Sequence, residues 1–213
     1  MTALPLPALA GRNQNIEPFK TMEIVKEAKA LEAAGRSIIH MSIGEPDFTA
    51  PEPVQFALRD AVAEGRSQYT SALGNEALRE AIAAYYAQSE GLEVDPGCII
   101  ITAGASAALT LACLALVNPG DEVLLTDPSY PCNRHFVAAA NGVAKAVPVD
   151  AESRFQLNAS LIRDHWVAAT RGALIATPAN PTGTSITWTD LCECLEEVRK
   201  RNGFVIVDEI YQG

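Results

Sequence analysis

The spacing of hydrophobic residues along the chain changes near residue 98. Before this point apolar positions recur every three or four residues, as in the run Phe19, Met22 and Val25, which is typical of amphipathic helices. Helices are therefore predicted at about 17–34, 51–64 and 75–89. Gly35 directly follows the first of them, where a glycine commonly ends a helix.

After residue 98, short apolar runs alternate with helical segments. The runs predict strands at 98–102, 122–127, 144–150, 172–177 and 204–208. The segments between them predict helices at 106–117, 131–140, 158–169 and 187–201. Asn158 is the expected cap of one helix, and Thr187 or Thr189 of another. Strands that alternate with helices indicate a three-layer α/β/α fold with a mostly parallel sheet.

Composition and charge exclude several classes of protein. The chain has 213 residues, 48% of them hydrophobic and 20% charged, so it can bury a substantial core. Its formal net charge of −10 argues against a nucleic-acid partner. Its apolar runs are too short to cross a bilayer, and its start does not resemble a secretory signal.

The five cysteines show no framework spacing and no metal-ligand pattern. Cys192 and Cys194 stand two apart in a predicted helix, so they point to different faces, and no second ligand pair lies near them. We interpret all five as ordinary reduced thiols without a metal, which fits a cytoplasmic protein.

Polar residues follow the predicted strands at the edge where ligands bind in parallel sheets. Ala105 and Ser106 open a helix after the first strand, where small residues and free N–H groups favour a phosphate, although an ordinary turn would look the same. Tyr130 follows the second strand and could stack on a planar ligand or be structural. Asn180 follows the fourth, where its amide could bind a ligand oxygen or close its own turn.

The last strand ends in two adjacent carboxylates. Side chains alternate faces along a strand, so Asp208 and Glu209 cannot both enter one site. One carboxylate beneath a cationic partner, such as a protonated ring nitrogen, is the better interpretation. Tyr211 adds a phenol close by. A phosphate cradle, a flat ring, an amide, an acid and a phenol together predict a site for pyridoxal 5′-phosphate.

Five motifs in this order resemble the class I and II aminotransferases of the aspartate aminotransferase fold type. They are "IGEPDF" (43–48), "QYTSALGNEALREAI" (68–82), "DPSYPCNRHF" (127–136), "ANPTG" (179–183) and "VDEIY" (207–211). The resemblance implies a large domain of the pyridoxal-phosphate transferase fold type I. It also implies that residues 50–213 belong to this large domain, and residues 1–49 to an N-terminal arm and part of a small domain.

The resemblance also implies roles for the residues around the cofactor ring. Asp208 would keep the pyridinium nitrogen protonated, and Tyr211 and Asn180 would bind the ring oxygen O3′. Tyr130 would stack on the ring, where relatives often have Trp or Phe. Glu209 would be structural.

Further implied roles concern the phosphate and the substrate. Ala105 and Ser106 would hold the phosphate through backbone N–H groups and a hydroxyl. Gly44 would lie next to the substrate carboxylate, with Asn180 also at the substrate. Tyr69 would reach the phosphate of a neighbouring subunit, which implies a homodimer.

The sequence departs from the family pattern in one respect. The family's Schiff-base lysine and the arginine that binds the substrate carboxylate lie after the last motif, whereas the sequence stops at Gly213. The lysines present lie away from the strand ends; they are Lys20, Lys26, Lys29, Lys145 and Lys200. We therefore expect a truncation, and expect the 213 residues alone to be inactive.

The expected activity of the parent protein is transfer of an amino group between an amino acid and a 2-oxo acid, in amino acid metabolism. Another reaction of the same fold, such as β-elimination by a C–S lyase, and a truncated non-catalytic relic are the alternatives. Fold alone does not separate them, because the chemistry is set by the site. The groups that select the substrate side chain are expected to lie largely outside this sequence.

Overall fold

The computed structural model describes residues 8–212, which form two compact units. One unit contains the chain up to Phe19 and the chain from Gly104 onward; the other is Lys20–Ala103. These two units are defined by contacts among the 213 residues. The domain boundary expected at residue 50 concerns the domains of the whole protein, and it stays a prediction. Each unit is described by itself.

A four-stranded parallel sheet forms the centre of the first unit. Its strands are β1 (Glu122–Asp127), β2 (Val143–Pro148), β3 (Thr170–Ala176) and β4 (Phe204–Asp208). Their order in the sheet is β2-β1-β3-β4, and all three neighbouring pairs run parallel. The carboxyl ends of β1, β3 and β4 therefore lie side by side at one edge.

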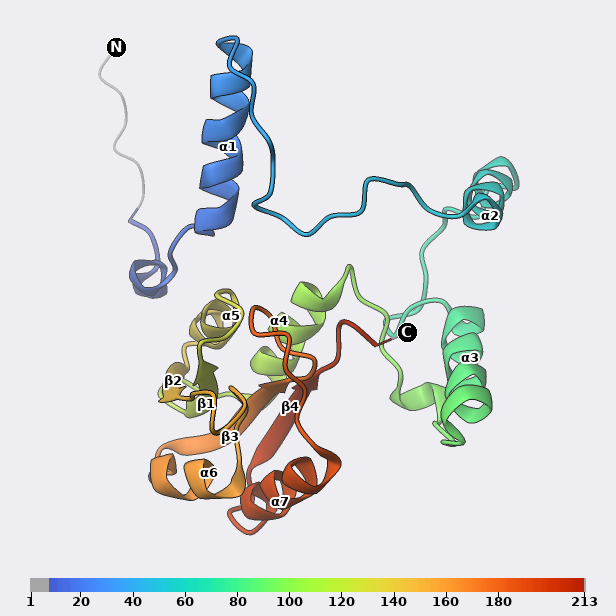
Figure 1. Ribbon diagram of the computed structural model, residues 1–213. Helices are drawn as coiled ribbons and strands as arrows, with labels where there is room; N and C mark the ends of the chain where they lie inside the picture. The colour runs from blue at the N-terminus through green and yellow to red at the C-terminus, as the bar shows by residue number, and fades with distance from the viewer. Residues whose placement is uncertain (1–7, 213) are drawn as a thin grey trace. The chain divides into compact units, whose positions relative to one another are not determined.

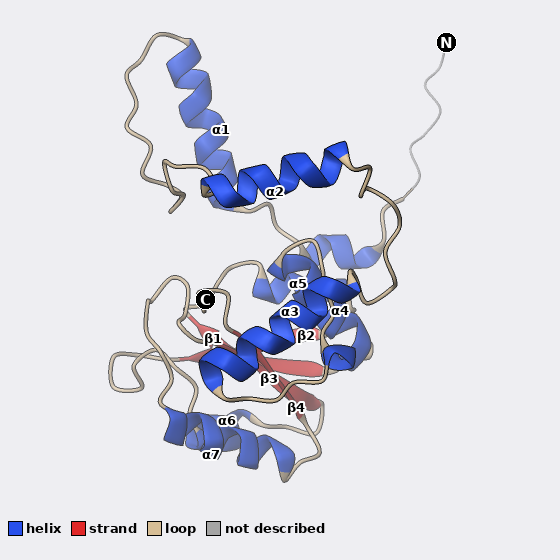
Figure 2. Ribbon diagram, turned by 90° about the vertical axis from the view of Figure 1, so that its right-hand side faces the viewer, coloured by secondary structure: helices blue, strands red, loops and turns tan. Residues whose placement is uncertain are grey.

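Helices cover both faces of this sheet, as Figures 1 and 2 show. Two of them, α4 (Ala105–Leu116) and α5 (Asn133–Ala139), lie on one face. The other face carries α6 (Ala159–His165) and α7 (Trp188–Arg199). The expected three-layer α/β/α fold is confirmed.

Alternating strand residues divide the core into two clusters. Val123 and Leu125 of β1 pack with Leu109 and Cys113 of α4, whereas Leu124 between them enters the opposite cluster. This second cluster includes Ile162 and Cys194 beneath α6 and α7. The period of two along a buried strand thus supplies apolar side chains to both helical layers.

Local signals set the helix ends. The Asn158 side chain accepts a hydrogen bond from the N–H of Leu161 at 2.9 Å, and Thr187 does the same for Asp190 at 3.1 Å. Of the two threonines considered for α7, Thr187 is therefore the cap. Asn202 has φ 53° and ends α7 in the left-handed region.

The second unit contains α1 (Lys20–Ala33), α2 (Glu52–Ala63) and α3 (Glu76–Tyr85), close to the predicted ranges. A π-helical turn, Tyr86–Glu90, continues α3. Gly35 has φ 89° and ends α1 as expected: its N–H bonds the Glu32 carbonyl, and the Arg36 N–H bonds the Leu31 carbonyl.

The strand predicted at 98–102 is wrong. Cys98 ends a short 3₁₀-helix, Pro96–Cys98, and no strand of the described residues pairs with the segment that follows. Within this segment the Ile101 N–H bonds the Leu73 carbonyl at 2.9 Å. An apolar run becomes a strand only where a neighbouring strand satisfies its backbone groups.

Of the helices in residues 8–212, none combines the length and apolar character needed to cross a membrane. Over the same residues, no group of three or more His, Cys, Asp or Glu side chains is arranged to hold a metal ion. All five cysteines are free; Cys194 is buried, whereas Cys192 is half-buried.

Candidate active site

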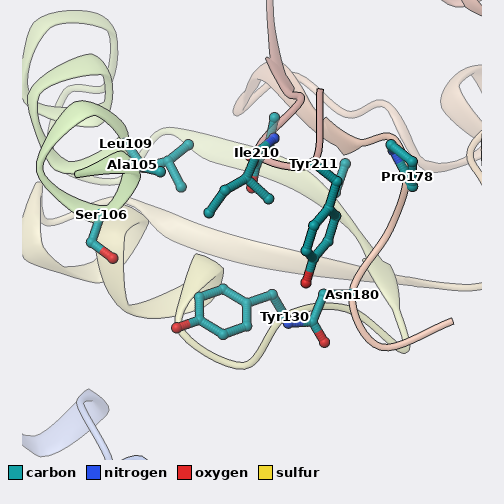
Figure 3. Close-up of a pocket in the computed structure, with 10 residues that line it drawn as sticks. Ala105, Ser106, Leu109, Tyr130, Pro178, Asn180, Ile210 and Tyr211 are labelled. Atoms are coloured by element: carbon teal, nitrogen blue, oxygen red, sulfur yellow. The ribbon is translucent and has the colours of Figure 1, made fainter. Parts of the chain in front are cut away.

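A pocket lies at the carboxyl edge of the sheet, where the segments after β1, β3 and β4 meet the start of α4 (Figure 3). It encloses about 150 Å³. The residues that line it are Ala105, Ser106, Leu109, Tyr130, Ala176, Pro178, Asn180, Asp208, Ile210 and Tyr211. Six of the residues singled out in the sequence thus share one cavity.

The start of α4 forms one wall of the pocket. Gly104 precedes the helix with φ 80°, a conformation that side chains rarely adopt. As in any α-helix, the first-turn N–H groups, here those of Ala105 and Ser106, have no carbonyl partner within the helix. This helix end, with the Ser106 hydroxyl beside it, is suited to an anion.

Tyr130 faces this helix end and is held by two neighbours. Its hydroxyl is hydrogen-bonded to the Cys132 side chain, two residues along the same loop. Phe19 packs against its ring edge-on, with centroids 5.9 Å apart and planes at 75°. The Cys132 contact, together with burial and the negative charge of nearby Asp208, raises the pKa of Tyr130 to about 12. The phenol is therefore protonated at neutral pH.

Asn180 lies in the segment that follows β3, residues 177–184, which we call the Asn180 loop. Within it the Gly183 N–H bonds the Ala179 carbonyl at 2.7 Å, and the Ala179 N–H bonds the Thr184 carbonyl at 2.9 Å. Gly183 has φ 68°, which the tight turn requires. In Figure 3 the Asn180 amide and the Tyr211 hydroxyl point toward the same part of the pocket.

The end of β4 contributes the acid of the site. Asp208 lines the pocket, and its Oδ1 accepts a hydrogen bond from the Ile210 N–H at 3.2 Å. Glu209 is exposed and is not among the lining residues. The two carboxylates therefore differ in position, as expected from the alternation of side chains along a strand.

Gly44 and Tyr69 belong to the second unit. A side-chain carbon built at Gly44 would meet nothing within 4 Å, so the backbone there is open to close approach. Tyr69 is fully exposed and lies in the segment before α3, where Thr70, Ser71 and the first turn of α3 line the same hollow.

Several residues around the pocket escaped the sequence analysis. Leu109 follows Ser106 by three positions, so helical spacing alone could have placed it on the same face. Ile210 lies between two recognised residues. The contact of Phe19 with Tyr130 carries no sequence signal, because it depends on how distant segments pack, and that of Cys132 depends on the conformation of its own loop.

Comparison with known proteins identifies the family. The profile of the family "Aminotransferase class I and II" matches residues 36–213, and the chain belongs to this family. Its members are pyridoxal-phosphate-dependent enzymes with this fold. The resemblance stated from the motifs is thereby confirmed.

Similar proteins carry different substrate names. The chain is 34% identical over 93% of its length to valine–pyruvate aminotransferase of Mycobacterium tuberculosis, covering 51% of that protein. It is 34% identical over 96% of its length to aspartate aminotransferase of Geobacillus stearothermophilus, covering 52%. The solved aspartate aminotransferase of Thermus thermophilus matches with a TM-score of 0.90 and 30% identity, over 96% of this chain and 54% of that one. The chain spans about half the length of these relatives.

Proposed function

We propose that this chain supplies most of the cofactor site of a pyridoxal-phosphate-dependent aminotransferase that exchanges an amino group between an amino acid and a 2-oxo acid. The observation that carries the proposal is the single pocket shared by Asp208, Tyr211, Asn180, Tyr130 and the start of α4. Family membership supports the same assignment.

The donor set of the pocket fits the groups of pyridoxal phosphate. Asp208 would bind the pyridinium nitrogen and keep its proton in place, since a carboxylate favours a nearby cation. Tyr211 and Asn180 would donate hydrogen bonds to the phenolic oxygen O3′. With its nitrogen protonated, the bound ring withdraws electrons from the α-carbon of an amino acid attached to it.

Two further contacts would hold the cofactor in place. The N–H groups of Ala105 and Ser106, with the Ser106 hydroxyl, would bind the phosphate, because a helix start favours an anion. Tyr130 would lie against the ring face. The phenol is neutral at pH 7, as a tyrosine with the ordinary pKa of 10.0 would also be, so no second negative charge competes with Asp208 for the ring nitrogen.

The remaining groups are proposed to come from outside these 213 residues. They are the Schiff-base lysine that would move a proton at the substrate α-carbon, and the arginine that would bind the substrate carboxylate. Gly44 and Asn180 are proposed to contact the substrate. We also propose a cytoplasmic location, which suits the five free thiols.

A homodimer is part of the proposal. The full exposure of Tyr69 supports its reaching the phosphate of a partner subunit. Exposed apolar side chains on α4, Leu111 and Leu114, are the type of surface that interfaces cover. Light scattering on the purified protein measures the mass directly, and a monomer at micromolar concentration would contradict this part.

The activity is tested with the product of the gene including any coding sequence after codon 213. We expect amino transfer that requires both an amino acid and a 2-oxo acid acceptor. Release of ammonia and pyruvate without an acceptor would instead indicate a β-eliminating lyase.

The 213 residues alone are expected to bind pyridoxal phosphate weakly and reversibly and to show no amino transfer, because removal of a covalent nucleophile costs orders of magnitude in rate. Dialysis followed by borohydride treatment measures covalent attachment. Stable, reducible attachment with turnover would show that one of the five lysines of this chain acts as the nucleophile.

A further inference from the structure

A buried glutamine joins the two ends of the Asn180 loop. Gln156 lies in the segment between β2 and α6 and is only 4% exposed. Its Nε2 donates to the carbonyl of Ala176 at 3.2 Å, directly before the loop, and to the carbonyl of Thr184 at 2.8 Å, at the loop's end. The Thr184 hydroxyl lies 3.3 Å from the same nitrogen. One side-chain amide thus binds both ends of the loop that carries Asn180.

These contacts are continuous with the bonds inside the loop. The Thr184 carbonyl that accepts from Gln156 also accepts from the N–H of Ala179, the residue before Asn180. The hydroxyls of Thr182 and Thr184 lie 3.0 Å apart. A change at Gln156 therefore passes to the backbone next to Asn180 through a single shared carbonyl.

Gln156 is itself held on both sides. The Asp150 carboxylate accepts hydrogen bonds from the N–H groups of Glu152 and Ser153, both at 3.0 Å, which fixes the turn before it. Leu157 after it is fully buried in the cluster beneath α6 and α7. The thiol of Cys194 donates to the Leu157 carbonyl at 3.7 Å. The glutamine side chain therefore extends from a rigid segment.

We propose that Gln156 is a positioning residue for Asn180: it closes the Asn180 loop and so sets where the Asn180 amide lies in the pocket. The inference rests on the proposed function, because the importance of that amide is its contact with the cofactor ring. Gln156 is not among the residues that line the pocket, so it acts through the loop.

The physical reason for a glutamine here is that both acceptors are carbonyl oxygens. Only a side chain with two N–H donors on one nitrogen binds both ends at once. A glutamate of the same shape would place a carboxylate against these oxygens, which removes the Gln156 donor from each of them and adds repulsion. Both carbonyls would then lose a buried partner, and the loop would open.

The test uses the 213-residue chain and pyridoxamine 5′-phosphate, which carries the same ring and phosphate but forms no covalent bond with lysines. We expect Gln156→Glu to weaken its binding about five- to tenfold, the effect of about one hydrogen bond. Asn180→Ala should weaken it to a similar extent. Hydrogen exchange of the Ala179 and Gly183 amides should become faster in Gln156→Glu while that of the sheet stays unchanged.

The double variant separates positioning from general support. If Gln156 acts through Asn180, then Gln156→Glu combined with Asn180→Ala should bind no more weakly than Asn180→Ala alone. Gln55→Glu is the matched control, since the exposed Gln55 amide also binds a backbone carbonyl, that of Ala50 at 2.6 Å. We expect this control to leave both measurements unchanged.

Three outcomes would overturn the inference: losses that add in the double variant, unchanged exchange at Ala179 and Gly183, or unfolding of both Gln156→Glu and the uncharged Gln156→Met. Unfolding of both would mean that Gln156 supports the whole fold. Unchanged affinity in Asn180→Ala, or no binding by the unaltered chain, would contradict the proposed function instead. Hydrogen exchange at the Ala179 and Gly183 amides would then still decide whether Gln156 holds the loop.

Discussion

The backbone N–H of Thr177 donates a 2.9 Å hydrogen bond to the carbonyl of Asp208. This bond extends the pairing of β3 with β4 by one position, past the last strand pair of Ala176 with Asp208. It joins the first residue of the Asn180 loop to the residue that supplies the carboxylate. The amide and the acid of the pocket are thus held in register by main-chain bonds, independently of any ligand.

Asp208 and Glu209 should respond differently to neutralisation. Asp208→Asn should weaken binding of pyridoxamine 5′-phosphate by about ten- to a hundredfold, because an amide cannot stabilise a protonated ring nitrogen as a carboxylate does. Glu209→Gln should change it less than about twofold, since this side chain is exposed outside the pocket lining. A fluorescence titration of each variant measures the affinity. Equal losses would contradict the assignment of Asp208.

The titration of Tyr130 should depend on Cys132. In Cys132→Ala we expect the pKa of Tyr130 to fall from about 12 toward its ordinary value of 10.0, because the hydrogen bond that the phenol donates to the Cys132 sulfur is the largest cause of the rise. Ultraviolet difference titration against Tyr130→Phe isolates this phenol. Cys98→Ala, at an exposed cysteine, is the control. An unchanged titration in Cys132→Ala would exclude this hydrogen bond as the cause.

The same contact predicts how stability depends on alkaline pH. Tyr130 keeps its proton in the folded chain to about pH 12, whereas the unfolded chain releases it near pH 10.0. The unfolded state therefore binds fewer protons in this window, and the free energy of unfolding should decrease from pH 10 to 12. Burial also raises the pKa of Cys194 to about 12. The decrease in the unaltered chain therefore contains a contribution from Tyr130 and one from Cys194. Urea unfolding at each pH should show a smaller decrease in Cys132→Ala.

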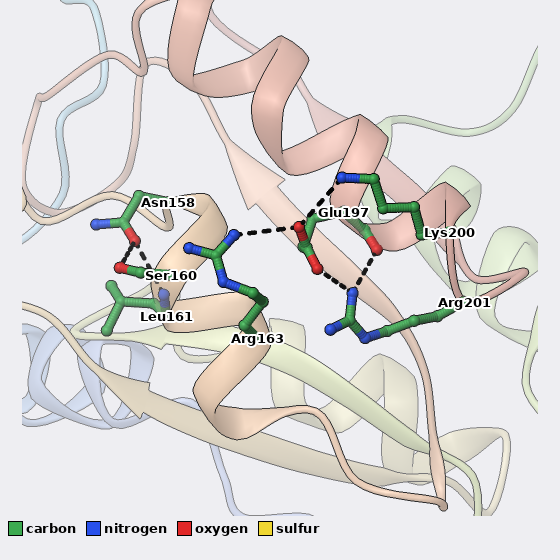
Figure 4. Close-up of polar contacts among 7 residues, drawn as sticks. All are labelled: Asn158, Ser160, Leu161, Arg163, Glu197, Lys200 and Arg201. Atoms are coloured by element: carbon green, nitrogen blue, oxygen red, sulfur yellow. Dashed lines mark hydrogen bonds and ion pairs between the residues drawn. The ribbon is translucent and has the colours of Figure 1, made fainter.

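Glu197 is the centre of an ion-pair cluster between α6 and α7 (Figure 4). It is only 6% exposed and lies 3.2 Å from Arg163 and 3.7 Å from Lys200, with Arg201 hydrogen-bonded to its other oxygen. The bond from Arg201, followed by that from Arg163, lowers the pKa of Glu197 below its ordinary value of 4.5. The cluster should therefore stabilise the fold above pH 4.5, the ordinary pKa of a glutamate. This stabilisation should be lost as the pH falls through the lowered pKa of Glu197.

Glu197→Gln should lower the unfolding temperature at pH 7 and weaken the dependence of stability on acidic pH. The difference from the unaltered chain should shrink below pH 4, where the carboxylate is neutralised in the unfolded state. Glu196→Gln, at the exposed neighbouring position, is the control. Thermal unfolding of each variant, followed by circular dichroism between pH 3 and 7, measures the unfolding temperature and its dependence on pH. Identical curves for the two variants would contradict the role of the cluster.

Gly172 in β3 should not tolerate a side chain. A carbon added there would lie 2.5 Å from the ring of Phe204, its pairing partner in β4. We expect Gly172→Ala to reduce the free energy of unfolding by roughly 1–3 kcal/mol, the usual effect of overpacking. Gly11→Ala, where nothing lies within 4 Å, should change it by less than about 0.5 kcal/mol. Urea unfolding tests both, and a neutral Gly172→Ala would show that Phe204 moves aside.

Much of the fold was predictable because its signals are local. The run at 122–127 coincides with β1, Glu122–Asp127, and the caps at Asn158 and Thr187 use side chains that bond within the next three residues. The edge of the sheet at which Tyr130, Asn180 and Asp208 meet follows from the rule for parallel strands. Each of these features depends on residues near one another in the chain.

The segment 98–102 shows where this reasoning stops. Its composition is that of a strand, yet the described residues offer it no ladder partner, and it forms none. A strand is a property of two segments, and only one of them is visible in a local pattern. The same holds for Phe19, whose contact with Tyr130 joins positions more than a hundred residues apart.

The sequence by itself therefore determined the class of fold, the order of its elements apart from the segment 98–102, and the residue types at the strand ends, since these follow from periodicity, capping and spacing. Only the tertiary structure decided how the pocket is supported: Cys132 and Phe19 against Tyr130, and Gln156 across the Asn180 loop. The contacts of Phe19 and Gln156 arise when distant segments pack together, and that of Cys132 depends on how its own loop folds, so no pattern of hydrophobic spacing marks them.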